Sequence, residues 1–345
     1  YEMGGDHAYE GQTDLYVRSE DPELVYETIP WASVVCRSCT HPMERAYDSI
    51  RVTLDGRGLR NRSFPPQRPE GVTRVLALGG SNTFGPTVTD GDTWPDQVQR
   101  ALDELHPGRF EVYNGGRNAY VMTQKVRLLS LLAPELDPDL VIIQDHNKGR
   151  RAFFSRDPDY AGHFARNRDL YEENLPWWSG SAEDSHPVHR GLVRWSRVYR
   201  AVYGAWLGFA TRSEGHAQAG RPTDGVPSID SLAVPPAERI ALQRFEDVVS
   251  GLDVPIIVLG HFTECQPEER AFKPDGRMGS YSNVQYYDLC PPEEQSPAER
   301  ELWMEIHPPS HVYAWYGDHI TEHVVLPSLR ANSSADLYRP SSDFQ

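Results

Sequence analysis

The sequence has no long apolar segment, which excludes a membrane-spanning helix within it. No apolar run approaches the ~20 residues that a helix needs to cross a bilayer. The first residues also lack the basic, apolar and small-residue succession of a secretory signal. Because the numbering begins at Tyr1 rather than at a methionine, we keep open the expectation of a signal or a membrane anchor upstream of this chain.

Positive charge is scarce relative to negative charge. The chain has 34 Lys and Arg against 50 Asp and Glu, which gives a formal net charge of −16. Such an excess repels nucleic acid and anionic membrane surfaces, so we expect no nucleic-acid partner. The 39% hydrophobic content is enough for a sizeable core, so a folded α/β protein is expected rather than a disordered chain.

Cysteine is rare as well, with four residues at positions 36, 39, 265 and 290. Disulfides, a zinc site and redox chemistry all remain open for them. A zinc site built from two C-x-x-C pairs is excluded because only Cys36 and Cys39 have that spacing, and their polar, Pro-containing surroundings differ from the strand-to-helix turn of a thioredoxin motif. We favour disulfides, which indicate an oxidising, extracytoplasmic compartment: secreted, periplasmic, or lumenal and membrane-anchored.

Composition divides the chain into three parts. Residues 1–20 are polar and are expected to form a loose leader, and residues 21–70, with short apolar stretches between Pro and Gly, are expected to form a small β-rich appendage. Residues 71–345 form the main domain, which a segment rich in aromatic residues and Arg interrupts at about 150–235. We interpret those aromatic side chains as the core of a helical insertion rather than as a dedicated ligand platform.

The main domain alternates buried strands with amphipathic helices. Strands are expected at 74–80, 110–114, 140–143 and 254–259, and helices at 93–105, 123–132 and 236–251. This alternation predicts a three-layer α/β/α sandwich with a central parallel sheet. Ligands bind such sheets at the carboxyl ends of the strands, so the polar residues that follow each strand are the candidates for a site.

A glycine-rich turn follows the first of these strands. It reads LGGSNTFG over residues 78–85, so Ser81 lies where the chain leaves a buried strand. Glycines allow a sharp turn and a close approach of the backbone to a substrate. A phosphate-binding loop is not favoured, since the Lys-Ser/Thr pair that it needs is missing and G-x-G-x-x-G is not matched. On this motif alone, a structural glycine turn with a capping Ser remains the alternative to a nucleophile.

Four polar segments occur in a fixed order along the domain. They are GGSNTFG at 79–85, YNGGRNAY at 113–120, QDHN at 144–147 and EIHPPS at 305–310. This order resembles the four blocks of the SGNH (GDSL-like) hydrolases, which place a Ser, a Gly, an Asn and a His at successive points around the active edge of the sheet. The resemblance runs from about residue 21 to residue 329 without the insertion, and it implies an SGNH-type fold and serine ester chemistry.

The resemblance implies a role for each block. Ser81 is the nucleophile and His307 its base, while the oxyanion is bound by the Ser81 N–H, the Gly116 N–H and the Asn147 amide. The polar residues beside these blocks are candidates for substrate contact: Asn82, Arg117, Asn118, His146 and Arg150. Neither a cofactor nor a metal is implied.

Two departures from the family pattern concern the orientation of the catalytic groups. The Asp that usually precedes the His by three residues is replaced by Met304. A carboxylate from another segment, a backbone carbonyl or the adjacent Glu305 remains to orient the imidazole, and we take Glu305 as the candidate; otherwise the enzyme is slow or inactive. In the third block, Asp145 and His146 add a carboxylate and an imidazole beside the proposed oxyanion hole.

A competing pattern lies near the C-terminus. His319, Glu322 and His323 have the H-x-x-E-H form of some zinc peptidases, in which two His side chains share one helix face. His307 and His311 have the same spacing, but the two prolines between them exclude a regular helix there. A surface helix is the favoured interpretation of residues 319–323, and a zinc hydrolase is the alternative.

Taken together, these patterns predict a metal-independent serine ester hydrolase or acyl-ester transferase that works through an acyl-enzyme. The expected substrate is a small-molecule or carbohydrate ester outside the cytoplasm, with acetyl as the expected acyl group. A catalytically impaired SGNH-like module that binds a glycan or a partner protein is the alternative from a different class. The sequence does not indicate an oligomeric state.

Overall fold

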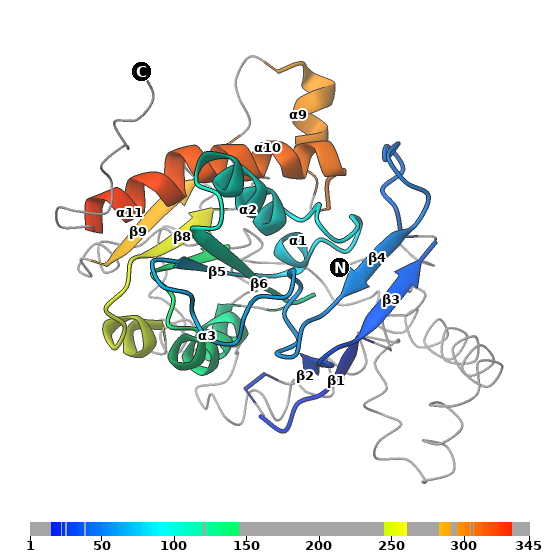
Figure 1. Cartoon of the computed structure of the whole chain (residues 1–345). Helices are drawn as coiled ribbons and strands as arrows, with labels where there is room; N and C mark the ends of the chain where they lie inside the picture. The colour runs from blue at the N-terminus through cyan, green and yellow to red at the C-terminus, as the bar shows by residue number, and fades with distance from the viewer. Residues whose placement is uncertain are drawn as a thin grey trace, which may run out of the picture.

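The computed structural model describes residues 15–144, 245–260, 283–290 and 295–332, apart from residues 22, 25, 38, 119, 121, 304 and 306. Its centre is a five-stranded parallel sheet in the order β6-β5-β7-β8-β9 (Figure 1). The strands are β5 (Thr73–Gly79), β6 (Phe110–Gly116), β7 (Leu140–Gln144), β8 (Ile256–Gly260) and β9 (Val284–Asp288). The order places β5, which leads into Ser81, between β6 and β7.

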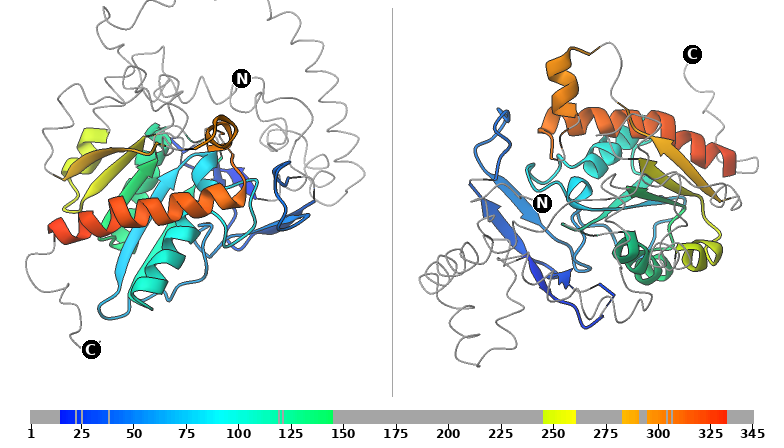
Figure 2. Two further views of the ribbon diagram at one scale, coloured as in Figure 1. Left: turned by 90° about the horizontal axis from the view of Figure 1, so that it is seen from above. Right: turned by 180° about the vertical axis from the view of Figure 1, so that it is seen from behind.

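Helices cover both faces of this sheet (Figures 1 and 2). One face carries α2 (Trp94–Leu105) and a C-terminal helical run of α10 (Ser310–Ile320), the π-helix η6 (Thr321–Val325) and α11 (Leu326–Asn332). The opposite face carries α3 (Met122–Leu136) and helical residues 245–250. Strand alternation divides the core accordingly: Leu76 and Leu78 of β5 pack on the α3 side, and Val75 and Ala77 on the α2 side. This three-layer arrangement confirms the predicted fold class.

The helix α2 illustrates how the local sequence sets an element. The Thr93 side chain accepts from the Asp96 backbone, and Asp96 accepts in return from the Thr93 backbone, which forms a capping box at the predicted start. Pro95 lies in the first turn, where its missing N–H is not needed. The C-terminal helix then packs closely on α2, since a Cβ at Gly317 would overlap Gln97. This close approach fixes α10, and with it the His307 segment that precedes α10.

The N-terminal appendage consists of two antiparallel two-stranded sheets. They pair β1 (Tyr16–Arg18) with β2 (Tyr26–Thr28), and β3 (Ser33–Cys36) with β4 (Ile50–Thr53). The strand β1 lies inside the expected leader, so described structure begins at Leu15 rather than at residue 21. Buried residues of the appendage, such as Tyr26, share one apolar cluster with the central sheet. The appendage is therefore packed against the main domain rather than separate from it.

Other expectations fall partly or wholly outside the described residues. The expected insertion at about 150–235 lies outside them, and so does most of the helix expected at 236–251. Cys36 and Cys39 form a disulfide, which confirms that interpretation for this pair, whereas Cys265 lies outside. Within the described ranges, none of the helices has the length and apolarity needed to cross a membrane.

Candidate active site

Ser81 lies at the carboxyl end of the central sheet, directly after β5, and begins the short helix α1 (Ser81–Phe84). The turn between strand and helix is tight, since a Cβ at Gly79 would overlap the Thr83 hydroxyl. Gly85 ends α1 with φ of 74°, a left-handed conformation that suits glycine. The other three residues of α1 are buried while Ser81 is half-buried, so Ser81 is the α1 residue that reaches solvent.

Arg60 of the appendage holds the far end of α1. Its guanidinium donates to the carbonyl oxygens of Phe84 at 2.7 Å and Val88 at 2.6 Å, and also to that of Gly85. The side chain is only 1% exposed and also reaches Asp90 at 3.4 Å. Helix-end carbonyls have no intrahelical partner, so this arginine satisfies them. The sequence does not indicate this role of Arg60, because one Arg among several in a polar turn carries no local signal of burial.

A buried polar network joins the nucleophile turn to the end of β7. The Gln144 amide donates to Asn82 Oδ1 at 2.9 Å, and the Gln144 carbonyl side-chain oxygen accepts from the Thr83 hydroxyl. The ammonium group of Lys125 donates to the Gln144 backbone carbonyl at 2.7 Å. Asn82 is 1% exposed and holds the turn through this bond, and its contact with substrate stays a prediction. The network also places the start of the third block beside Ser81.

The predicted oxyanion donors are in different situations. The Ser81 N–H belongs to the first turn of α1, where N–H groups have no intrahelical acceptor. The Gly116 N–H instead donates to Asn114 Oδ1 at 2.9 Å, so that donor is engaged in this structure. A Cβ at Gly116 would overlap the backbone of Phe84, which explains the glycine through close packing of β6 on α1. Asn147, the third predicted donor, lies outside the described residues, as do His146 and Arg150.

Arg117 and Asn118 follow β6 at the same end of the sheet. The Arg117 N–H donates to the Gly79 carbonyl at 3.1 Å, which ties it to the turn before Ser81. Its guanidinium, 2% exposed, donates to the Gly116 carbonyl at 2.9 Å, and burial lowers its pKa. Within the described part of the chain no carboxylate forms a salt bridge with it, in contrast to the buried Arg74, which pairs with Glu111 at 2.8 Å. Asn118 Oδ1 is buried without a hydrogen-bond partner there.

His307 lies in the loop before α10, and this loop contacts the segment that follows α1. The Thr87 hydroxyl donates to the Pro308 carbonyl at 3.5 Å. The His307 ring is half-buried, but its Nε2 atom is buried and has no hydrogen-bond partner, so no bond to the Ser81 hydroxyl is formed in this structure. Burial, and to a smaller extent the neighbouring His41, lower the pKa of His307 to about 4. The imidazole is therefore neutral near pH 7, as a general base must be.

Glu305, the predicted orienting residue, has a different partner. Its carboxylate accepts from His41 Nε2 at 2.5 Å. Met43 N donates to His41 Nδ1 at 3.0 Å, so the ring hydrogen of neutral His41 is on Nε2 and points at Glu305. Glu305 therefore pairs with His41 of the appendage rather than with the His307 ring. An orienting acid would bond to His307 Nδ1, and among the residues that the structure describes no carboxylate pairs with the His307 ring.

The H-x-x-E-H pattern belongs to the C-terminal helical run, away from these loops. His319 Nε2 lies 2.8 Å from the Tyr287 hydroxyl, and its ring stacks on Trp315 with centroids 4.7 Å apart. Burial, followed by the charge of His323, lowers the pKa of His319 to about 4. Across the described ranges no group of three or more His, Cys, Asp or Glu side chains is arranged to hold a metal ion, so the two His side chains lack a third ligand there. Glu322 is exposed.

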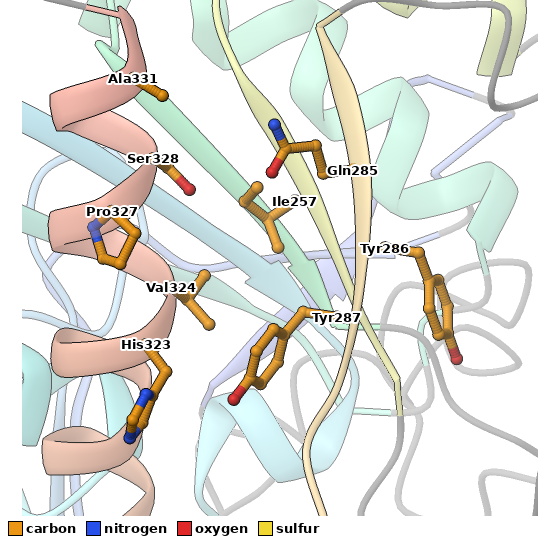
Figure 3. Close-up of a pocket in the computed structure, with 9 residues that line it drawn as sticks. All are labelled: Ile257, Gln285, Tyr286, Tyr287, His323, Val324, Pro327, Ser328 and Ala331. Atoms are coloured by element: carbon orange, nitrogen blue, oxygen red, sulfur yellow. The ribbon is translucent and has the colours of Figure 1, made fainter.

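A pocket lies beside this helical run, between it and strands β8 and β9 (Figure 3). Tyr287 and His323 flank it from opposite sides, and Ile257 and Val324 form part of its apolar wall. None of its lining residues belongs to the Ser81 turn, the end of β6 or the His307 loop. The pocket is therefore separate from the chemistry proposed for the carboxyl end of the sheet.

Comparisons with known proteins give similarity of fold only. No family model and no curated protein matches the sequence. Among solved structures, a carbohydrate acetylesterase family member from Sinorhizobium meliloti is 12% identical, with 75% of this chain and 100% of that chain covered and a TM-score of 0.34. A putative lipolytic protein of the G-D-S-L family from Desulfitobacterium hafniense is 14% identical, with 72% and 98% covered and a TM-score of 0.33. TesA is 14% identical, with 52% and 98% covered and a TM-score of 0.22.

Proposed function

We propose, from the premise of an SGNH/GDSL-like hydrolase fold, that this protein is a metal-independent serine ester hydrolase or acyl-ester transferase. The observation that supports it best is the arrangement around Ser81. Ser81 reaches solvent from a tight strand-to-helix turn, and Arg60 holds the end of that helix. The loop that carries the neutral His307 contacts Thr87, six residues after Ser81. A hydroxyl and a neutral imidazole at one end of a parallel sheet supply the two groups that acyl transfer requires.

The reaction follows from these groups. His307 Nε2 takes the proton of the Ser81 hydroxyl as its oxygen attacks the ester carbonyl. The tetrahedral oxyanion accepts from the Ser81 N–H and, as the resemblance implies, from Gly116 and Asn147. Collapse releases the alcohol, which receives the proton from His307, and leaves an acyl-Ser81 ester. Water or an acceptor hydroxyl then removes the acyl group by the same steps in reverse. Hydrogen bonds between catalytic groups often tighten only when substrate binds, which accommodates the unpartnered Nε2 of His307.

The proposed substrate is a small acyl ester, acetyl above all, on a carbohydrate or a similar extracytoplasmic molecule. The family resemblance suggests this class, and the Cys36–Cys39 disulfide supports an oxidising compartment. Substrate contacts are proposed for Arg117, a buried guanidinium at the end of β6, and for Asn118, whose buried Oδ1 has no hydrogen-bond partner among the described residues.

A second candidate is an SGNH-like module that binds a glycan or a partner protein with little turnover. One observation favours it: Glu305 pairs with His41, which leaves His307 without that carboxylate. A protein whose catalytic His lacks an orienting acid can still bind its substrate but loses much of its rate of turnover.

The test is hydrolysis of p-nitrophenyl acetate in excess chelator by the parent protein, Ser81→Ala and His307→Ala. Ser250→Ala and His311→Ala serve as matched controls, since both residues are exposed. We expect chelator-resistant activity that both site variants abolish and both controls retain. Activity that survives Ser81→Ala would refute the nucleophile assignment, and absence of activity in the parent would favour the binding module.

A further inference from the structure

The loop between β3 and β4 extends from the appendage onto the His307 segment. It follows the Cys36–Cys39 disulfide, whose Cα atoms are 5.6 Å apart, and contains His41, Glu44 and Tyr47. Its first anchor is the bond of His41 to Glu305, two residues before His307. His41 is 8% exposed and both of its ring nitrogens are hydrogen-bonded, so its position and tautomer are fixed.

The second anchor is on the other side of His307. Glu44 Oε2 accepts from the backbone N–H of Ser310, three residues after His307, at 3.0 Å. Ser310 is the first residue of α10, and Pro309 in the cap position offers no side-chain bond of its own. A carboxylate is favoured at a helix N-terminus, where N–H groups lack partners. Although burial alone would raise it, hydrogen bonds from Ala46, Ser310 and Arg45 lower the pKa of Glu44 to about 2.

A third contact ties the same loop to the nucleophile side. The Thr89 N–H donates to the Tyr47 hydroxyl at 3.3 Å, and Thr89 lies shortly after the α1 turn that carries Ser81. One short loop therefore contacts the chain on both sides of His307 and also contacts the segment that follows Ser81. Contacts that served only to attach this loop to the main domain would not need to lie on both sides of His307.

We propose that His41 and Glu44 are positioning residues that hold the His307 ring at the carboxyl end of the sheet, in place of the acidic residue that Met304 replaces. The proposal rests on the proposed function, because only a catalytic His307 gives this restraint a consequence for rate. His41 acts through Glu305 and Glu44 through the start of α10. Neither touches the reacting atoms.

The first experiment measures kcat and KM for p-nitrophenyl acetate in His41→Ala, Glu44→Ala and Glu44→Gln. Glu299→Ala is the matched control, since Glu299 likewise accepts from the backbone of Ser296 at the start of another helix, α9 (Pro297–Trp303). We expect kcat to fall about tenfold or more in both alanine variants with KM within about twofold, because small displacements of a catalytic group are costly in rate. Glu44→Gln keeps an acceptor oxygen for Ser310 and is expected to recover most of the rate.

The second experiment reads the ring itself by NMR and needs no turnover. We expect one sharp set of His307 imidazole signals in the parent and in Glu299→Ala, and broadened or multiple signals in His41→Ala and Glu44→Ala. Unchanged signals, or folded variants with parental kcat, would overturn the proposal. Hydrolysis that survives Ser81→Ala would instead remove the proposed function, while the NMR spectra would still decide whether the loop holds the ring.

Discussion

Replacing Arg60 by Met removes the group that holds the C-terminal end of the nucleophile helix while keeping an unbranched side chain of similar length. Arg60 donates to four carbonyl oxygens, those of Arg51, Phe84, Gly85 and Val88, and it is 1% exposed. A buried acceptor left without a partner costs about 1–3 kcal/mol. Because the four carbonyls share one donor group, their losses do not add fully. We therefore expect Arg60→Met to lower the free energy of unfolding by about 3–5 kcal/mol.

Urea unfolding of Arg60→Met, Arg60→Lys and Arg100→Met measures this effect, with a constant m-value as the sign of an intact two-state transition. Arg60→Lys keeps the positive charge but not the planar guanidinium with its several N–H donors, so an intermediate loss of unfolding free energy is expected. Arg100 is the control, because it also donates to a backbone carbonyl, that of Gly91, but its side chain is 54% exposed. Its loss should be below about 1 kcal/mol. If Arg60→Met loses no more unfolding free energy than Arg100→Met, the reasoning that the buried Arg60 guanidinium stabilises α1 is refuted.

Three further predictions follow from the same geometry. The pKa of His307 is lowered to about 4, so kcat/KM should decrease as the pH falls through about 4 rather than through about 6.5. In the unfolded chain the same imidazole has its ordinary pKa of about 6.5 and binds a proton at higher pH than in the folded protein. His307 therefore lowers the free energy of unfolding as the pH falls from about 6.5 to about 4. The His307→Gln variant should lack this part of the pH dependence of unfolding. Removing the disulfide by Cys36→Ser with Cys39→Ser should lower stability by about 2 kcal/mol in urea unfolding, and a dithiol reductant should have no further effect on that variant. Gly79→Ala should lose about 1–3 kcal/mol because its Cβ would overlap Thr83. Gly80→Ala is its control, since a Cβ there meets only the Tyr120 carbonyl, at 3.6 Å, and equal losses in the two variants would contradict the turn argument.

Elements set by local apolar periodicity were predictable from the sequence. The strand expected at 74–80 is β5 (Thr73–Gly79), and the helix expected at 93–105 is α2 (Trp94–Leu105). The helix expected at 123–132 continues to Leu136, through Pro134, because burial of Leu136 outweighs the missing hydrogen bond. The strand β9 was missed, since its sequence VQYYD has only one buried residue and resembles a loop.

The contacts that define the candidate site were not predictable in the same way. Motif order was enough to nominate Ser81 and His307, because each lies beside a local turn signal. The partners that hold them come from far along the chain: His41 and Glu305 are separated by 264 positions, and Glu44 and Ser310 by 266. Periodicity and capping rules describe neighbours within a few residues, so they carry no information on such pairs. The same limit explains why Glu305 was assigned to His307, its neighbour in sequence, rather than to His41.

The lack of a carboxylate paired with the His307 ring among the described residues has a definite kinetic meaning. An orienting acid does two things: it selects the tautomer with a free Nε2, and it stabilises the imidazolium that forms in the transition state. Without an orienting acid, the tautomer that carries its proton on Nδ1 is not selected, so the first loss is limited to the fraction of rings with the wrong tautomer. The second loss is larger, because burial has already lowered the pKa of His307 to about 4 and makes the imidazolium costly. A base of this kind works slowly on an ester with a poor leaving group but adequately on one with a good leaving group, since the latter needs less proton transfer in the transition state. We therefore expect p-nitrophenyl acetate to be hydrolysed much faster than a simple alkyl acetate of the same size, and equal rates on the two would show that His307 is assisted by a charge from elsewhere.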